Sequence, residues 1–95
     1  LAVARLRDDD ADIPAHERIV SAGCAIQNLL LMAHALGFGA ALTSGKALAS
    51  APLRTLFGLG EAEQALCFVS VGTVLKARPA RARPLPAQYV STLAP

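Results

Sequence analysis

Apolar residues recur at spacings of three and four between His16 and Leu36, and this pattern predicts one long helix. One face of the helix is formed by Ile19, Ala22, Ile26, Leu29, Leu30 and Ala33. Further apolar residues spread around most of the remaining surface, namely Val20, Cys24, Leu31 and Ala35. We therefore expect other parts of a protein to cover this helix on more than one side.

Helix-start and helix-stop signals flank this run. Asp12 precedes Pro14, so an acceptor side chain stands before a proline whose missing N–H costs nothing in a first turn. Gly37 and Gly39 follow the helix, and glycine readily adopts the left-handed conformation that ends helices. The chain should thus enter the helix from a polar loop and leave it through a tight turn.

Shorter elements are predicted on either side of the long helix. Leu1 to Leu6 reads as a strand, Ala40 to Thr43 as a short extended run, and Ala65 to Val74 as a buried strand. Ser50 can cap a second helix that runs through Phe57, with Pro52 tolerated in its first turn and Gly58 or Gly60 at its end. The expected order is strand, helix, extended run, helix, strand, which is an α+β arrangement.

The last part of the chain has a different composition. Between Lys76 and Pro86, prolines alternate with the cations Lys76, Arg78, Arg81 and Arg83, which is typical of an extended segment. We therefore divide the chain into a folded part, residues 1–75, and a basic, Pro-rich tail, residues 76–95. Tyr89, Val90 and Leu93 could anchor this tail on another surface.

Composition and length limit the class of protein. Hydrophobic residues make up 54% of the 95 residues, which favours a folded chain of one small domain. The best membrane-span candidate, Ile19 to Leu36, is interrupted by polar residues, and no secretory signal is visible, so we expect a cytoplasmic protein without a membrane segment. The chain begins at Leu1 inside a strand pattern, from which we expect that an amino-terminal half is missing.

Several candidate sites receive structural interpretations. Cys24 and Cys67 lie far apart without metal-type spacing, so we expect two buried free thiols. Asp8 to Asp12 lacks the glycine and the spaced acceptors of a calcium loop and is expected to be a solvated loop. His34 is interpreted as a structural or solvated residue, although an acid–base role is conceivable. No nucleophile–base pair, phosphate loop or metal site is predicted, so no residue is assigned a catalytic role.

An ordered series of short motifs resembles the carboxy-terminal half of the FMN-dependent nitroreductase family. The first motifs are Ile13-Pro14, Ser21-Ala22-Gly23, Gln27-Asn28-Leu29-Leu30, Ala33-His34-Ala35-Leu36-Gly37-Phe38-Gly39 and Thr43-Ser44-Gly45. The later motifs are Pro52-Leu53-Arg54, Leu59-Gly60 and Phe68-Val69-Ser70-Val71-Gly72-Thr73. Each motif is short, and their order over residues 13 to 92 carries the resemblance.

This resemblance implies a nitroreductase-like helix-and-sheet sandwich and an intertwined homodimer with FMN at the subunit interface. It also implies hydride transfer from NADH or NADPH through the flavin to a small-molecule acceptor such as a nitroaromatic or a quinone. In this family the first half of the chain supplies an Arg- and Ser-containing motif for the FMN phosphate, and this sequence contains no copy of that motif. The resemblance does not distinguish NADH from NADPH, nor does it identify the acceptor.

The loop after the long helix is the expected flavin site. A flavin needs hydrogen-bond donors along its polar edge and a defined orientation more than it needs acidic side chains. The resemblance places Leu42, Thr43, Ser44 and Gly45 beside the isoalloxazine ring, with Leu42-Thr43 where many relatives carry a bulky Trp-Arg or similar pair. Lys46 could replace the lost cation. The resemblance also suggests nicotinamide contacts at the end of the long helix, matching Met32 to Gly37.

The basic tail is open to three interpretations. It could be a solvated arm, it could wrap a partner subunit and place Arg81 or Arg83 near the FMN phosphate, or it could bind nucleic acid. We favour the solvated arm over the phosphate contact. Four cations without interleaved aromatics would give only a nonspecific footprint on nucleic acid, so we expect no nucleic-acid partner. For the whole chain, the alternative to the oxidoreductase is a non-catalytic dimerisation or regulatory module with a nitroreductase-like fold.

Overall fold

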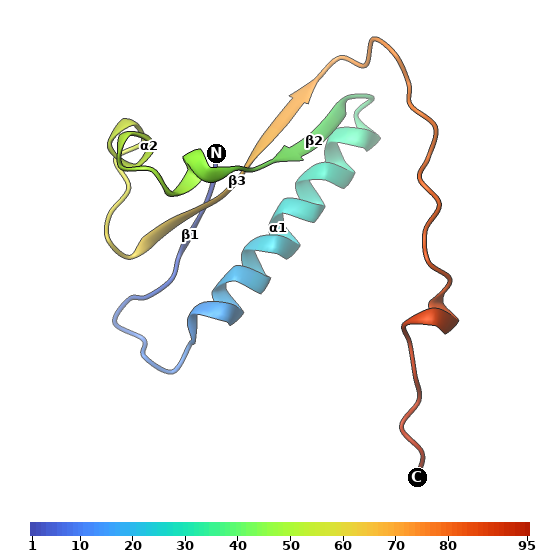
Figure 1. The fold of residues 1–95 in the computed structure, drawn as a ribbon, viewed down its shortest axis with the longest axis horizontal. Helices are drawn as coiled ribbons and strands as arrows, with labels where there is room; N and C mark the ends of the chain where they lie inside the picture. The colour runs from blue at the N-terminus through green and yellow to red at the C-terminus, as the bar shows by residue number, and fades with distance from the viewer.

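Three strands form one antiparallel sheet in which the last strand lies in the middle (Figure 1). The computed structural model describes residues 1–95. The strands are β1 (Ala2–Arg5), β2 (Gly39–Thr43) and β3 (Glu63–Gly72), in the order β1-β3-β2. The first half of β3 pairs with β1, from Arg5↔Glu63 to Ala2↔Cys67. Its second half pairs with β2, from Thr43↔Phe68 to Gly39↔Gly72, so each edge strand covers only half of β3.

Helix α1 (Ala15–Ala35) lies along one face of this sheet and contacts β1 and β2. The periodic face expected from the sequence turns toward the strands, since Ala33 is buried and Ala22, Ile26 and Leu30 are half-buried. Gly37 ends the helix with φ +86° and donates its N–H to the carbonyl of His34, as the glycine signal predicted.

The helix start differs from the prediction. Pro14 occupies the cap position itself, with an extended backbone, and no side chain bonds to the first N–H groups. Asp12 does not cap the helix. Its own backbone N–H donates to the carboxylate of Asp10, because the acidic loop forms successive turns of its own.

The outer face of α1 is uncovered in this chain. Val20 and Leu31 are exposed, and Cys24, expected to be a buried thiol, is exposed on the same face. The sequence pattern predicted cover on more than one side, but the single sheet packs against only one side of the helix. Any further cover must come from outside the folded part of a single copy.

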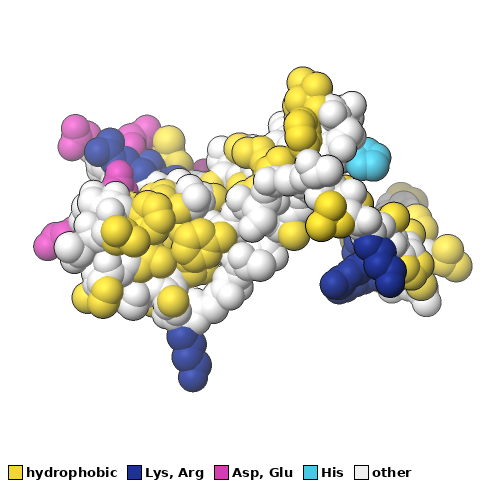
Figure 2. Space-filling model, turned by 90° about the horizontal axis from the view of Figure 1, so that it is seen from above, with side chains coloured by type: hydrophobic (Ala, Val, Ile, Leu, Met, Phe, Trp, Pro, Cys, Tyr) yellow, Lys and Arg dark blue, Asp and Glu magenta, His cyan; other side chains and the backbone are white.

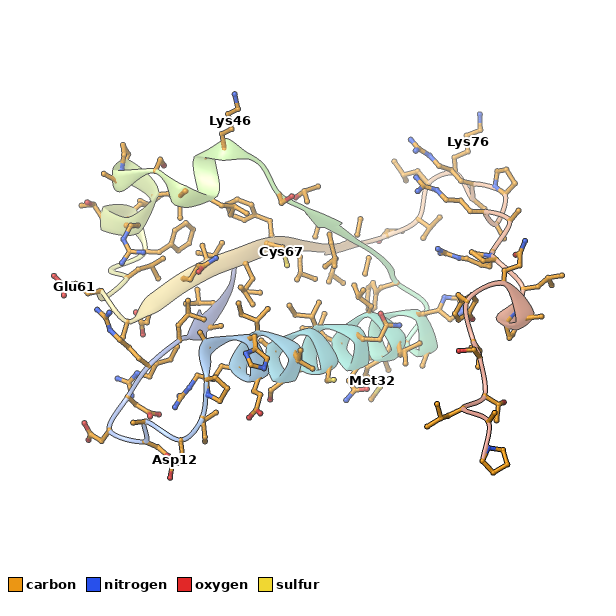
Figure 3. All side chains as sticks on the ribbon, turned by 60° about the horizontal axis from the view of Figure 1, so that its bottom comes forward. Asp12, Met32, Lys46, Glu61, Cys67 and Lys76 are labelled. Atoms are coloured by element: carbon orange, nitrogen blue, oxygen red, sulfur yellow. The ribbon has the colours of Figure 1, made fainter.

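A short helical segment follows β2 and lies on the other side of β3 from α1 (Figure 3). It consists of a 3₁₀ turn, η1 (Lys46–Ala49), and helix α2 (Ala51–Leu56). Ser50 caps α2 as predicted, accepting the N–H of Leu53, and Gly58 ends the segment with φ +62°. The Phe57 ring lies 6.4 Å from that of Phe68 on β3, between centroids. The side chains of Val69 and Val71 line a cleft with α1 instead, as the alternation of side chains along a strand requires.

The core is small and consists of small side chains: Ala4, Ala33, Ala65 and Cys67 are its buried residues. Cys67 is therefore the buried thiol that the sequence predicted. Small side chains remove little apolar area from water, while many large ones stay exposed, among them Leu56, Leu36 and Met32. No helix of the structure combines the length and the apolar character that crossing a membrane requires.

After Gly72 the chain leaves the sheet and runs as an extended segment, with one short turn, η2 (Pro86–Gln88). Strand β3 begins two residues before the predicted Ala65 and ends two before Val74. Figure 1 shows the tail descending past the end of α1, separate from the folded part. Leu75 and Leu93 are 97% and 94% exposed, and Tyr89 and Val90 are exposed as well. The expected mixture of helices and an antiparallel sheet, the α+β class, is confirmed.

Candidate functional site

The segment from Leu42 to Lys46 leads from the sheet into the η1 turn. The β2–β3 ladder holds its first residues, with Leu42 opposite Val69 and Thr43 opposite Phe68. Ser44 and Gly45 then leave the ladder, and Lys46 begins η1. A strand anchors one end of the segment and a helical turn anchors the other, so a loop of only two residues is fixed in place.

This two-residue loop presents unused backbone donors. The N–H groups of Ser44 and Gly45 donate to no acceptor within the chain, whereas the Gly45 carbonyl accepts the N–H of Leu48 at 3.1 Å. The Gly45 backbone is extended, with φ 160° and ψ 177°, and a Cβ added there would meet no atom within 4 Å. The loop therefore has two neighbouring N–H groups without an acceptor, and the space beside the Gly45 Cα is open.

Of the side chains around the loop, only that of Lys46 carries a charge. Leu42 is 47% exposed and Thr43 and Ser44 are exposed. Lys46 extends away from the body of the molecule and forms no ion pair (Figure 3). An ammonium group so placed can approach an anion that arrives from solvent, but it does not itself enclose a site.

Ser50 stabilises the helical turn that follows the loop. Its hydroxyl donates to the Ala47 carbonyl at 2.7 Å and accepts the Leu53 N–H at 3.3 Å, so one side chain closes η1 and starts α2. The Ser50 N–H also donates to the Ala47 carbonyl, at 3.1 Å. The direction in which η1 leaves β2 is thereby set by local hydrogen bonds.

Arg54 on α2 also stabilises this region, a role that the sequence did not predict. Its guanidinium donates to the carbonyls of Glu63 at 2.9 Å and Gly60 at 2.6 Å, tying α2 to the start of β3. The only sequence signal for it is the Pro52-Leu53-Arg54 motif, which gives no indication of these partners because they lie six and nine residues away.

The tail cations do not join the loop within one copy. Arg81 and Arg83 belong to the extended tail, which lies beyond the far end of β2 from Lys46 (Figures 1 and 3). Figure 2 shows basic side chains gathered on this arm and separated from the body of the molecule. The seven candidate residues therefore form one contiguous group, Leu42 to Lys46, and one separate pair.

Two other regions carry no polar site. His34 is exposed in the last turn of α1 and takes part in hydrogen bonding only through its backbone. A cleft of about 450 Å³ lies between α1 and the sheet, and its nine lining residues are all hydrophobic, including Ile26, Leu29 and Val69. Such a surface favours apolar contact and supplies no group that could orient a polar ligand.

The donor set of the loop fits one part of a flavin. The polar edge of an isoalloxazine ring carries carbonyl oxygens and ring nitrogens that accept hydrogen bonds, and Ser44 and Gly45 offer two N–H groups without a partner. Lys46 is the cation adjacent to the loop, and its ammonium can approach negative charge on the ring.

Comparison with known proteins identifies a family for most of the chain. The nitroreductase family matches residues 1–73 of the chain. A Haemophilus influenzae protein named as an NAD(P)H nitroreductase is similar to this chain. The two sequences are 38% identical over 71 residues, which are 75% of this chain and 39% of that protein. The chain thus spans well under half the length of this relative. The family match ends at residue 73, before the tail begins, and so leaves out Arg81 and Arg83.

Proposed function

The chain belongs to the nitroreductase family, and we propose that it forms part of an FMN-dependent oxidoreductase that uses NADH or NADPH to reduce a small acceptor such as a nitroaromatic or a quinone. The flavin, when bound, supplies the hydride chemistry. The work of this chain is to bind and orient the flavin. No side chain near the loop is needed as an acid or a base.

The observation that carries the proposal is the pair of free N–H groups at Ser44 and Gly45. Backbone donors held by a strand and a helical turn need no reorganisation when they bind an acceptor, and they stabilise negative charge that develops on it. In the proposed complex these donors meet the polar edge of the flavin ring, Leu42 and Thr43 flank the ring, and the Lys46 ammonium lies close enough to favour the reduced, more anionic form.

We further propose a homodimer with the flavin at its interface. The exposed apolar face of α1 and the apolar cleft beside it are surfaces that a single copy leaves in contact with water. The tail carries four cations clear of its own sheet. In a dimer the tail could lie along the partner and bring Arg81 and Arg83 to the phosphate of the flavin on that subunit.

A substitution at Gly45 tests the loop without disturbing the fold. The Gly45 backbone is extended and open, so Gly45→Ala should leave the urea unfolding midpoint unchanged while its methyl group obstructs the ring. We expect the Gly45→Ala variant to bind FMN about tenfold more weakly than wild type, as measured by quenching of flavin fluorescence. Gly60→Ala is the matched control, because a Cβ there makes only an ordinary contact of 3.8 Å. Equal FMN affinity in the two variants would contradict the assignment of the loop.

A paired substitution tests the tail. Replacing Arg81 and Arg83 by serine should weaken FMN binding and leave riboflavin, which lacks the phosphate, unaffected. The control replaces Lys76 and Arg78 by serine and removes the same charge from the same arm. If both double variants lower FMN affinity alike, the tail acts only through its net charge, and Arg81 and Arg83 are not phosphate ligands.

A further inference from the structure

Arg54 is half-buried, yet its guanidinium has no carboxylate partner. Two of its five N–H groups donate to the carbonyls of Gly60 and Glu63. The nearest acids in sequence are engaged elsewhere, since Glu63 accepts the Gly60 N–H at 2.8 Å and Glu61 lies 3.8 Å from Arg7. Neither carboxylate lies within 4.0 Å of the Arg54 nitrogens. The backbone holds this cation in place and leaves part of its donor capacity unused.

Arg54 lines a cleft of about 370 Å³ between η1 and the start of β3. The other lining residues are Gly45, Leu48, Ala49, Gln64, Ala65 and Leu66. No acidic side chain is among them. One of these residues adds a potential donor, since the Gln64 amide has no hydrogen-bond partner in the chain.

One guanidinium and one neutral amide donor beside a cavity without a carboxylate favour a bound anion. Arginine presents its N–H groups in a planar fork that matches the oxygens of a phosphate, and partial burial strengthens that interaction. The cleft meets the flavin loop at Gly45, which belongs to both. A nucleotide at the loop could therefore extend an anionic group into the cleft.

We propose that the cleft between η1 and β3 is a phosphate-binding subsite, with Arg54 as its cation and the Gln64 amide as a further donor. The identity of the molecule that carries the phosphate rests on the proposed function, but the existence of the subsite does not. The phosphate belongs either to FMN or to the nicotinamide nucleotide, and both present the same chemistry to Arg54.

Calorimetric titration with inorganic pyrophosphate tests the subsite directly on the gene product that contains these residues. Gln64→Glu places a carboxylate in the cleft and leaves the Arg54 hydrogen bonds untouched, so it should weaken pyrophosphate binding at least about tenfold. Ala11→Glu in the exposed loop between β1 and α1 makes the same change in net charge away from the cleft and should have little effect. Arg54→Lys keeps the charge but loses the fork, and we expect it to weaken binding as well. Arg54→Lys also disturbs the two hydrogen bonds to backbone carbonyls. The thermal unfolding curve of this variant is therefore measured as well, to separate a loss of stability from a loss of binding.

Flavin titrations then separate the two sources of phosphate. If FMN supplies it, Gln64→Glu weakens FMN but not riboflavin; if the nicotinamide nucleotide supplies it, both flavins bind normally and NADH or NADPH binds more weakly. A protein that binds no flavin but keeps a pyrophosphate site sensitive to Gln64→Glu would retain the subsite and contradict the proposed function. Absence of pyrophosphate binding, or equal binding to wild type and Gln64→Glu, would overturn the subsite.

Discussion

Arg18 and Asp8 form a two-point ion pair that closes the loop between β1 and α1. Both terminal nitrogens of the guanidinium donate to the Asp8 carboxylate, at 2.6 and 2.8 Å. Arg18 also donates to the backbone carbonyls of Asp10 and Ile13. The acidic run expected to be a solvated loop is therefore organised around one arginine of the following helix, and this arrangement sets the path by which the chain enters α1.

The pair gives folding a defined pH dependence. Hydrogen bonding from Arg18, helped by the Asp10 N–H, lowers the pKa of Asp8 from 3.8 to about 2. Because the folded-state pKa lies below the unfolded one, the stabilisation is fully present above pH 3.8 and is lost as the pH falls toward 2. We expect Asp8→Asn to lower the urea midpoint by a constant amount from pH 8 to 5, with the difference from wild type shrinking below pH 4.

Asp9 provides the control for this measurement, because its carboxylate has no partner in the loop. Asp9→Asn should leave the urea midpoint close to that of wild type at every pH. A difference between Asp8→Asn and wild type that stays constant down to pH 2 would mean that the ion pair contributes nothing through the charge of Asp8.

Ser50→Ala should destabilise the segment that supports the loop. The substitution removes the cap of α2 and the hydroxyl bond to Ala47 together, so we expect a loss of about 1–2 kcal/mol in the free energy of unfolding. Ser91→Ala in the extended tail removes the same hydroxyl where it has no partner and should be neutral. Equal midpoints for the two variants in urea would show that the cap does not contribute to stability.

The uncovered face of α1 predicts self-association. A chain with four buried residues and an exposed apolar helix face should associate or be poorly soluble when these 95 residues are produced alone. Leu31→Lys places a charge on that face and should weaken self-association about tenfold or more in sedimentation equilibrium. Leu56→Lys makes the same change on α2, where the side chain is 79% exposed, and should have little effect. A monomeric wild type would remove the support for a dimer through α1.

The elements that follow from local pattern were predictable. The long helix follows from apolar residues on one face, and its end and the end of α2 follow from Gly37 and Gly58, which take positive φ. The Ser50 cap was predictable for the same reason, since its partners lie within three residues. The resemblance to the nitroreductase family, now confirmed, supplied the interpretation of the loop that periodicity alone could not.

The parts that depend on distant contacts could not be predicted. The bond of Arg18 to Asp8 spans ten residues, and those of Arg54 span a turn whose shape the sequence does not specify. Exposure of Cys24 was misjudged because an apolar pattern shows which surfaces should be covered, but not whether the same chain covers them. The position of Arg81 and Arg83 in a site stays a prediction, since it depends on a second copy.

The visible absorption spectrum of the purified gene product tests the central claim most directly, followed by heat release and identification of the chromophore. We predict an FMN spectrum with one flavin per subunit, which bleaches when NADH or NADPH is added under anaerobic conditions. A colourless protein that takes up no added FMN would contradict the proposed function and would favour a non-catalytic dimerisation or regulatory module built on the same fold.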